Sequence, residues 1–273
     1  MAKLNKYGLS RSIPADVRRK VRQQSGYGCV ICGMGVIQYE HVDPEFHEAK
    51  FHDPSAITLL CPSCHSKVTT NFYSKQKVLK AMMSPAAKRA GFTKDFFDFC
   101  GPHPSIKIGG MKLIRCHSPV IIYDRPILKI EGPKEPGDAP FLLSGIFCDE
   151  YGQPTLEIVE NEWRANSESW DVEVSAGEIT VRDSPRNVVL RLKVIPPHTI
   201  LVERLKVRFG FVEINISGES INLKSPMSDL TLSDCLAEDC KVGISMYSLK
   251  RPSAAEHYSL ITRLIRHAYS IDG

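Results

Sequence analysis

The chain has 273 residues, of which 42% are apolar and 24% are charged, a composition that excludes a wholly disordered protein. At about 150 residues per domain, this length predicts two domains. No apolar run approaches the ~18 residues of a membrane-spanning helix, and residues 1–14 lack the apolar core of a secretory signal, so we expect a cytoplasmic protein.

Charge is distributed unevenly along the chain. Residues 1–90 carry 14 Lys and Arg against 6 Asp and Glu, a net charge of +8, whereas the remainder carries 21 against 25, a net charge of −4. A basic N-terminal part joined to a slightly acidic remainder indicates that the N-terminal part binds a polyanion. On charge alone, a solvated basic surface without a partner is the alternative.

The N-terminal part begins with residues 1–12, which read as a loose basic arm. Pro14 suits the first turn of a helix, and Gly26 suits its end. Apolar residues recur between them at a spacing of four and define the buried stripe of this helix. The stripe consists of Ile13, Val17 and Val21.

A short strand is then expected over residues 36–42, followed by a loop that contains Pro and His. The apolar segment 57–60 leads to a second helix that starts at Cys61 or Pro62, since Pro is favoured in a first turn. A further, Lys-rich helix is expected to extend toward Gly91.

The hydrophobic period changes after the Gly- and Pro-rich stretch 101–104. Many short apolar or alternating runs follow, separated by turn residues and without intervening helices, and this pattern predicts an all-β domain. A two-sheet sandwich is favoured, and a solenoid is the alternative. The predicted organisation is an α+β domain over residues 1–90, a linker over 91–104, a β-rich domain over 105–250 and a C-terminal helix over 251–273.

Four of the nine cysteines form two Cys-x-x-Cys pairs, Cys29/Cys32 and Cys61/Cys64, with 28 residues between them. Two such pairs predict a structural Zn²⁺ site, because four thiolates can close a tetrahedron around the ion and leave no open position for chemistry. Binding of the metal would supply much of the folding free energy of a small N-terminal domain.

Catalytic candidates lie beside these cysteines. Glu40 and His41 end the predicted strand, and His65 directly follows Cys64 on the predicted helix. One zinc ion that clamps the strand and the helix would bring Glu40 and His65 together, where they could hold a hard divalent ion such as Mg²⁺ or Mn²⁺. Adjacent strand residues point to opposite sides, so His41 is expected to face a water molecule instead, as a general base.

These motifs, in this order, resemble the zinc-stabilised form of the HNH endonuclease family. The resemblance rests on Cys29-Val-Ile-Cys32, Glu40-His41-Val42 and Leu59-Leu60-Cys61-Pro62-Ser63-Cys64-His65, and it covers about residues 14–70. It implies a ββα-metal fold that cleaves phosphodiester bonds with one catalytic divalent ion. It also implies that Glu40 and His65 bind that ion and that His41 is the general base.

Two positions depart from the family pattern. The metal-binding acid of the family is more often Asp or His than Glu, which is the residue at position 40. The family usually has an Asn five residues before the third cysteine, where this chain has Ala56. That Asn braces the loop behind the catalytic histidine, and its candidate replacements here are His47, His52 and Asp53.

We therefore expect a DNA endonuclease whose phosphate contacts include Arg18, Arg19, Arg22 and Lys67. The β-rich domain would recognise a target, mediate homo-oligomerisation or regulate the nuclease, and defence against foreign DNA is the setting that this architecture suggests. RNA stays open as a substrate. Two alternatives remain: a zinc-stabilised nucleic-acid-binding protein without cleavage activity, and a protein whose β-rich domain is the main actor.

Overall fold

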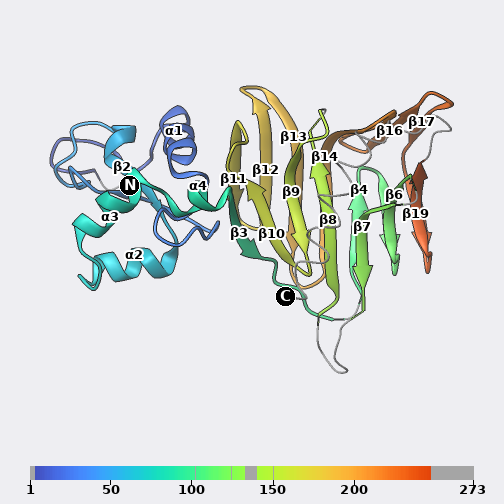
Figure 1. Cartoon of the computed structure of the whole chain (residues 1–273), viewed down its shortest axis with the longest axis horizontal. Helices are drawn as coiled ribbons and strands as arrows, with labels where there is room; N and C mark the ends of the chain where they lie inside the picture. The colour runs from blue at the N-terminus through green and yellow to red at the C-terminus, as the bar shows by residue number, and fades with distance from the viewer. Residues whose placement is uncertain (1–3, 102, 124, 133–139, 150, 247–273) are drawn as a thin grey trace. The chain divides into compact units, whose positions relative to one another are not determined.

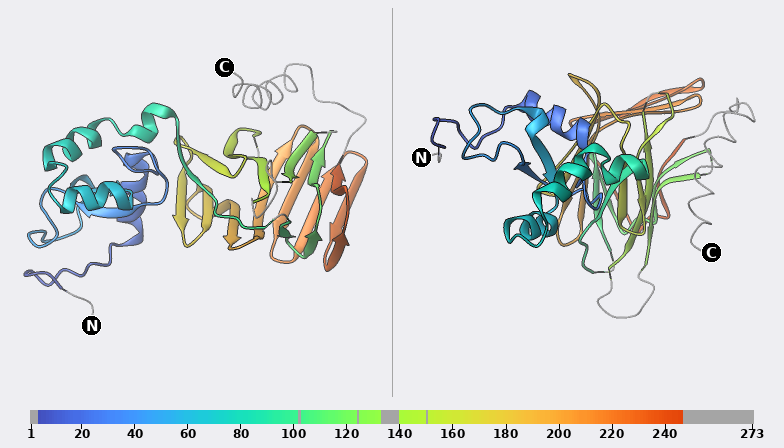
Figure 2. Two further views of the ribbon diagram at one scale, coloured as in Figure 1. Left: turned by 90° about the horizontal axis from the view of Figure 1, so that it is seen from below. Right: turned by 60° about the vertical axis from the view of Figure 1, so that its left-hand side comes forward.

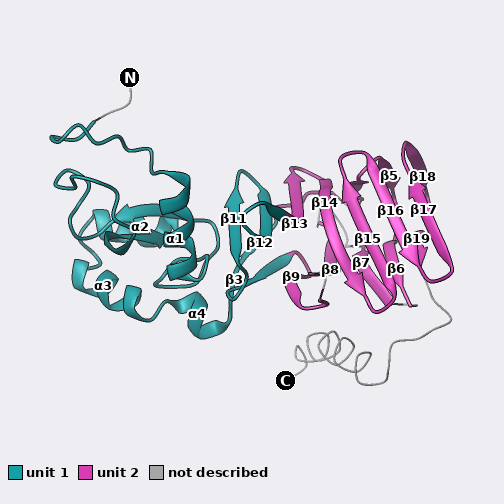
Figure 3. Cartoon of the chain, turned by 90° about the horizontal axis from the view of Figure 1, so that it is seen from above, with its two compact units in different colours: residues 1–97, 162–187 teal, residues 98–161, 188–273 magenta. Residues whose placement is uncertain are grey.

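The structure, a computed structural model, describes residues 4–101, 103–123, 125–132, 140–149 and 151–246 (Figure 1). Strands predominate over helices, which confirms the predicted β-rich character of the chain. The predicted C-terminal helix over 251–273 lies outside the described residues. Two compact units divide the chain (Figure 3), and each is built from two stretches of sequence. Unit 1 comprises Met1–Phe97 and Glu162–Asn187, and unit 2 comprises Asp98–Asn161 and Val188–Gly273.

All the α-helices of the described residues lie in unit 1. The unit also contains three pairs of strands and one 3-10 turn. Its N-terminal stretch contains α1 (Ala15–Ser25), β1 (Gln38–His41), η1 (Pro54–Ala56), β2 (Ile57–Leu60), α2 (Pro62–Thr69), α3 (Lys75–Met83), α4 (Ala86–Ala90) and β3 (Phe92–Phe96). Its second stretch contains β10 (Glu162–Asn166), β11 (Asp171–Ser175) and β12 (Glu178–Ser184). The strands pair antiparallel as β1 with β2, β3 with β10, and β11 with β12.

The second stretch of unit 1 was not part of the predicted N-terminal domain. Trp163 is 2% exposed and packs so closely on Gly35 that a Cβ atom there would lie 2.1 Å from the indole. The predicted linker 91–104 contains β3, which pairs with β10. Residues 162–187 therefore belong to unit 1 because of long-range packing, which no local pattern in the sequence predicts.

Helix α1 forms where its caps and apolar stripe predict it. It starts after Pro14, and Gly26 ends it in the left-handed conformation with a φ of 70°, which favours glycine. Val21 is fully buried in a cluster with Ile57 and Leu59 of β2. All four residues of β2 are buried, because its other face packs in the cluster that holds the cysteines.

The Lys-rich helix predicted to extend toward Gly91 is two helices, α3 and α4. The break falls at Ser84 and Pro85. Pro has no N–H to donate and disfavours helical geometry in the residue before it, so one continuous helix cannot pass this point.

The N-terminal arm from residue 4 onward is held by hydrogen bonds and is not loose as predicted. The Nδ2 atom of Asn5 donates to the carbonyl oxygens of Phe46 and Ala49, each at 2.7 Å. The Oδ1 atom of the same side chain accepts from the backbone N–H groups of Tyr7 and Leu9. One amide thus ties the arm to the loop that follows β1.

Unit 2 consists of strands in two sheets, drawn from two further sides in Figure 2. Within this unit one sheet has the order β19-β6-β7-β8-β9, and the other has the order β13-β14-β15-β16-β17, with β4 beside β14. The strands are β4 (Ser105–Ile108), β5 (Met111–Ile114), β6 (Ser118–Ile122), β7 (Arg125–Glu131), β8 (Leu142–Cys148), β9 (Pro154–Val159), β13 (Asn187–Ile195), β14 (Thr199–Phe209), β15 (Val212–Ser217), β16 (Ser220–Ser225), β17 (Ser228–Leu232), β18 (Cys235–Glu238) and β19 (Val242–Met246).

Apolar side chains from both sheets of unit 2 meet in one core. Ile146 of β8 and Leu128 of β7 line a small apolar cavity together with Val207 of β14 and Ile214 of β15. Burial of side chains between two sheets is the main source of stability for such a layered arrangement. None of the helices in the described part of the chain is both long and apolar enough to cross a membrane.

Candidate functional site

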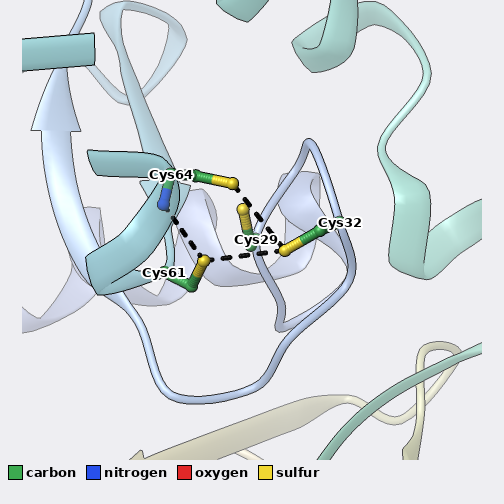
Figure 4. Close-up of side chains that lie close together, drawn as sticks. All are labelled: Cys29, Cys32, Cys61 and Cys64. Atoms are coloured by element: carbon green, nitrogen blue, oxygen red, sulfur yellow. Dashed lines mark hydrogen bonds between the residues drawn. The ribbon is translucent and has the colours of Figure 1, made fainter. Parts of the chain in front are cut away.

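The four cysteines of the two Cys-x-x-Cys pairs converge in unit 1. Cys29 and Cys32 lie in the turn after α1, Cys61 caps the start of α2, and Cys64 lies in the first turn of that helix. Figure 4 shows the side chains pointing toward one another, and their sulfur atoms all lie within 4.8 Å. Gly33, with a φ of 81°, lets the first pair close into a tight turn.

The spacing of the sulfur atoms suits a metal ion. Four sulfur ligands on a tetrahedron around zinc lie about 3.8 Å apart, given a Zn–S bond of about 2.3 Å. The Sγ atom of Cys32 lies 3.6 Å from that of Cys61 and 3.9 Å from that of Cys64. This four-cysteine cluster could therefore hold a structural metal such as zinc.

The thiols also influence one another's ionisation. A hydrogen bond with Cys32 lowers the pKa of Cys29 to about 5, and the same contact raises the pKa of Cys32. Burial raises the pKa of Cys64 to about 12. One thiolate forms readily, but further negative charge in the cluster is opposed, so four thiolates need a cation among them.

Glu40 and His65 lie side by side next to the cysteine cluster. Glu40 is on β1 and His65 is on α2, and the Nε2 atom of His65 lies 2.8 Å from the Oε2 atom of Glu40. Their side chains are 28% and 31% exposed, so solvent and a ligand can reach them. The four-residue strand, the helix start at Pro62 and the shared cysteine cluster together place this carboxylate against this imidazole.

His41 has different neighbours. Its ring is 9% exposed, and its Nε2 atom lies 3.0 Å from the Nδ1 atom of His52. The rings of His41 and Phe46 form a T-shaped pair with their centres 5.4 Å apart. Burial, His52 and Arg11 lower the pKa of His41 to about 4, so the ring is neutral at pH 7 and is a weaker base than a free imidazole.

Among the described residues, the only group of three or more Cys, His, Asp or Glu ligand atoms close enough to share one ion is the four-cysteine cluster. At the Glu40–His65 contact the described residues therefore offer two ligands, and His41 is not a third. Mg²⁺ is commonly bound through one or two protein ligands, with water and phosphate oxygens in the other positions. The Glu40–His65 donor set fits such an ion.

The loop that lacks the usual Asn is held by other contacts. The carbonyl oxygen of Ala56 accepts from the N–H of Val42 at 2.8 Å. The Oδ1 atom of Asp53 accepts from the N–H and the hydroxyl of Ser55. His47 is 66% exposed and lies beside two glutamates. Of the three candidate replacements, His52 is the one with a hydrogen bond to His41.

Arg22 does not serve as the predicted phosphate contact. Its side chain is 7% exposed and forms a two-pronged pair with Asp171, Nε to Oδ1 at 2.9 Å and Nη2 to Oδ2 at 2.7 Å. Its Nη1 atom donates to the hydroxyl of Tyr39. The sequence predicts an exposed Arg22 that binds phosphate. In the structure β11 packs against that side of α1, and Asp171 of β11 pairs with the Arg22 side chain inside unit 1.

Replacing Asp171 with alanine is expected to destabilise unit 1 by about 3 kcal/mol, because it leaves the buried charge of Arg22 with only the longer 3.5 Å contact to Glu173. Urea unfolding of the full chain measures this change. As a control, Glu48→Ala removes an exposed carboxylate whose partner Lys6 lies 3.9 Å away, and it should cost less than about 1 kcal/mol. Equal losses in both variants would show that the pair of Arg22 with Asp171 is not a structural lock.

The other predicted phosphate contacts remain accessible in part. Arg19 lies over the ring of Trp170 at 5.1 Å, and Lys67 of α2 lies 5.4 Å from the ring centre of Tyr73. Arg18 is half-buried on α1. Sequence reasoning missed Arg11, which is exposed, stacks on Phe46 at 4.7 Å and lies close enough to influence His41.

The chain matches no protein-family model, and no curated protein or solved structure matches it. The functional argument therefore rests on the residues and geometry of the site itself.

Proposed function

We propose that unit 1 is a metal-dependent HNH endonuclease domain that hydrolyses phosphodiester bonds in DNA. The observation that carries the proposal is the 2.8 Å contact between Glu40 and His65 beside the cysteine cluster. The order of elements agrees with the HNH resemblance, since β1 and β2 pair antiparallel and α2 follows directly. The four cysteines would hold Zn²⁺ as the structural ion.

In this proposal the residues divide the work between ion binding and proton transfer. Glu40 and His65 would hold Mg²⁺ or Mn²⁺. The bound ion would supply positive charge to the phosphate oxygens as negative charge develops on them. His41, neutral at pH 7, accepts the proton of the attacking water molecule.

Basic residues of unit 1 would bind the DNA backbone. Arg11, Arg18, Arg19 and Lys67 are the candidates, and residues 1–90 carry a net charge of +8. Contacts of this kind make affinity fall steeply as the salt concentration rises. Unit 2 would then recognise a target, mediate self-association or regulate the nuclease, and defence against foreign DNA is the setting that such a pairing suggests.

The experiment is incubation of the full chain with supercoiled plasmid DNA in Mg²⁺, in Mn²⁺ and in EDTA. The proposal predicts nicked or linear plasmid with either divalent ion and none in EDTA. Retarded migration of intact plasmid under all three conditions would instead support the non-cleaving nucleic-acid-binding protein. A parallel reaction with single-stranded RNA establishes whether cleavage is restricted to DNA.

Replacing Glu40 with alanine is expected to raise the Mg²⁺ concentration needed for half-maximal cleavage by at least about tenfold. The reason is that this change removes the only carboxylate of the Glu40–His65 donor set, while the cysteine cluster stays intact. Titration of Mg²⁺ in the plasmid assay measures the shift. Glu45→Ala, which removes an exposed carboxylate from the neighbouring loop, is the matched control and should leave the titration unchanged. An unaltered Mg²⁺ requirement in Glu40→Ala would contradict the assignment.

A further inference from the structure

We propose that His52 is a positioning residue that fixes the tautomer of His41, so that Nδ1 of His41 is the atom that accepts the proton. The inference deepens the proposed function and rests on it, because the tautomer matters for cleavage only where His41 is the base. His52 replaces the bracing residue that the family has at the position of Ala56, from a different place in the loop.

The argument begins with the carbonyl group of Ser10. The Nε2 atom of His52 lies 3.0 Å from this oxygen. A carbonyl oxygen only accepts hydrogen bonds, so Nε2 of His52 must carry the hydrogen. In a neutral His52 ring the lone pair then lies on Nδ1.

That lone pair faces His41. The Nδ1 atom of His52 lies 3.0 Å from the Nε2 atom of His41, and this contact is a hydrogen bond only if Nε2 of His41 carries the hydrogen. The lone pair of His41 is thereby assigned to Nδ1. Without His52 both tautomers of His41 would be populated, and only one of them offers a base at that atom.

The chain of contacts is anchored by the ordered N-terminal arm. Ser10 forms a backbone bridge with Leu4, and Asn5 fastens the same arm to the loop through Phe46 and Ala49. The position of the Ser10 carbonyl is therefore set by several hydrogen bonds. It gives His52 a fixed partner, as expected of a residue that orients another through a hydrogen bond.

Two substitutions at position 52 separate this role from a merely structural one. The side chain of asparagine reaches the place of the Nδ1 atom of a histidine, so His52→Asn can still accept from His41. The side chain of glutamine reaches the place of Nε2, so His52→Gln can still donate to Ser10 but does not accept from His41. His47→Asn is the control, since its ring is exposed and contacts only glutamates.

The test on the full chain is the ¹⁵N chemical shifts of the His41 ring, which distinguish protonated from unprotonated nitrogens. We expect Nε2 to be protonated in the wild type, His47→Asn and His52→Asn, and a mixture of tautomers in His52→Gln. A protonated Nδ1 in the wild type, or an unchanged tautomer in His52→Gln, would overturn the inference. This reading does not depend on cleavage, so it stands apart from failure of the proposed function.

Plasmid cleavage by the same variants provides the second reading. His52→Gln is expected to lower kcat by about 10- to 100-fold, with the Mg²⁺ requirement unchanged, and His52→Asn should recover most of that loss. Loss of activity in both variants together with loss of folding would indicate a structural role and overturn the inference. A wild type that never cleaves would refute the proposed function while the ring shifts still decide the tautomer.

Discussion

Replacing Cys61 with serine is expected to abolish metal binding at the cysteine cluster and to unfold the part of unit 1 around it. Zinc bound at such sites contributes about 10–16 kcal/mol to folding. The free energy of unfolding of a typical domain is only about 5–15 kcal/mol, so loss of the ion removes most of the stability of unit 1. Cys61 also accepts from the N–H of Cys64 at the start of α2. Serine can keep this helix cap, so loss of folding in Cys61→Ser reports on the metal.

Two measurements on the full chain check this expectation. Metal analysis of the purified protein should give about one zinc ion per chain for the wild type and none for Cys61→Ser. Hydrogen exchange should lose protection at the amide of Val30, which donates to Leu59 across the cluster. The control is Cys100→Ser, which replaces an exposed thiol and should change neither the zinc content nor the protection of Val30. Full protection at Val30 in metal-free Cys61→Ser would show that the cluster does not hold unit 1 together.

Local sequence rules predicted the elements that position the site. Pro14 and Gly26 mark the ends of α1, and Pro62 marks the start of α2, because these residues fix backbone angles in their immediate surroundings. The contact of Glu40 with His65 also follows from short-range arguments. A strand and a helix that share one cysteine cluster have little freedom to place these two side chains elsewhere.

The contribution of residues 162–187 to unit 1 could not be predicted in this way. These residues read as strands like their neighbours, and nothing in their pattern distinguishes the unit to which they belong. The partner of Arg22 is Asp171, 149 residues further along the chain. Helical periodicity predicts which side of α1 is polar, but it does not predict that another strand covers that side.

The same limit applies to the N-terminal arm. Basic, polar sequence without an apolar stripe predicts a loose segment, yet Asn5 satisfies two carbonyl groups of a distant loop. Single side chains that bond to the backbone leave no periodic signal. The contact between His52 and Ser10 is of this kind. The sequence therefore left His47, His52 and Asp53 open for the bracing role that we propose for His52.

These long-range contacts also decide how the nuclease proposal should be tested. A fragment that ends at residue 104 would lack Asp171, and the charge of Arg22 would lose its partner. It would also expose the face of Gly35 that Trp163 covers. Inactivity of such a fragment would therefore reflect poor folding, and substitutions in the full chain are the sharper test.

Replacing His41 with alanine is the most direct of these substitutions, and it is expected to lower plasmid cleavage by about 10²- to 10⁴-fold, the usual contribution of a general base. The ring is neutral at pH 7, and alanine offers no atom that can take the proton of the water molecule. Burial lowers the pKa of the ring to about 4, which makes it a weaker base than a free imidazole, so the loss should lie toward the lower end of this range. Single-turnover cleavage at saturating Mg²⁺ measures the loss.

His47→Ala is the matched control, since it removes an exposed imidazole six residues away that bonds to neither His41 nor His52. The zinc content of His41→Ala should stay close to the wild type, because the cysteine cluster is not touched. Its urea midpoint should fall, because the buried ring packs on Phe46 and bonds to His52, so cleavage is compared where both proteins are folded. Undiminished cleavage by His41→Ala would remove the base from the mechanism. An Mg²⁺ requirement shifted as in Glu40→Ala would instead make His41 part of the ion site, since a general base changes the rate at saturating Mg²⁺ and a ligand changes the concentration at which saturation is reached.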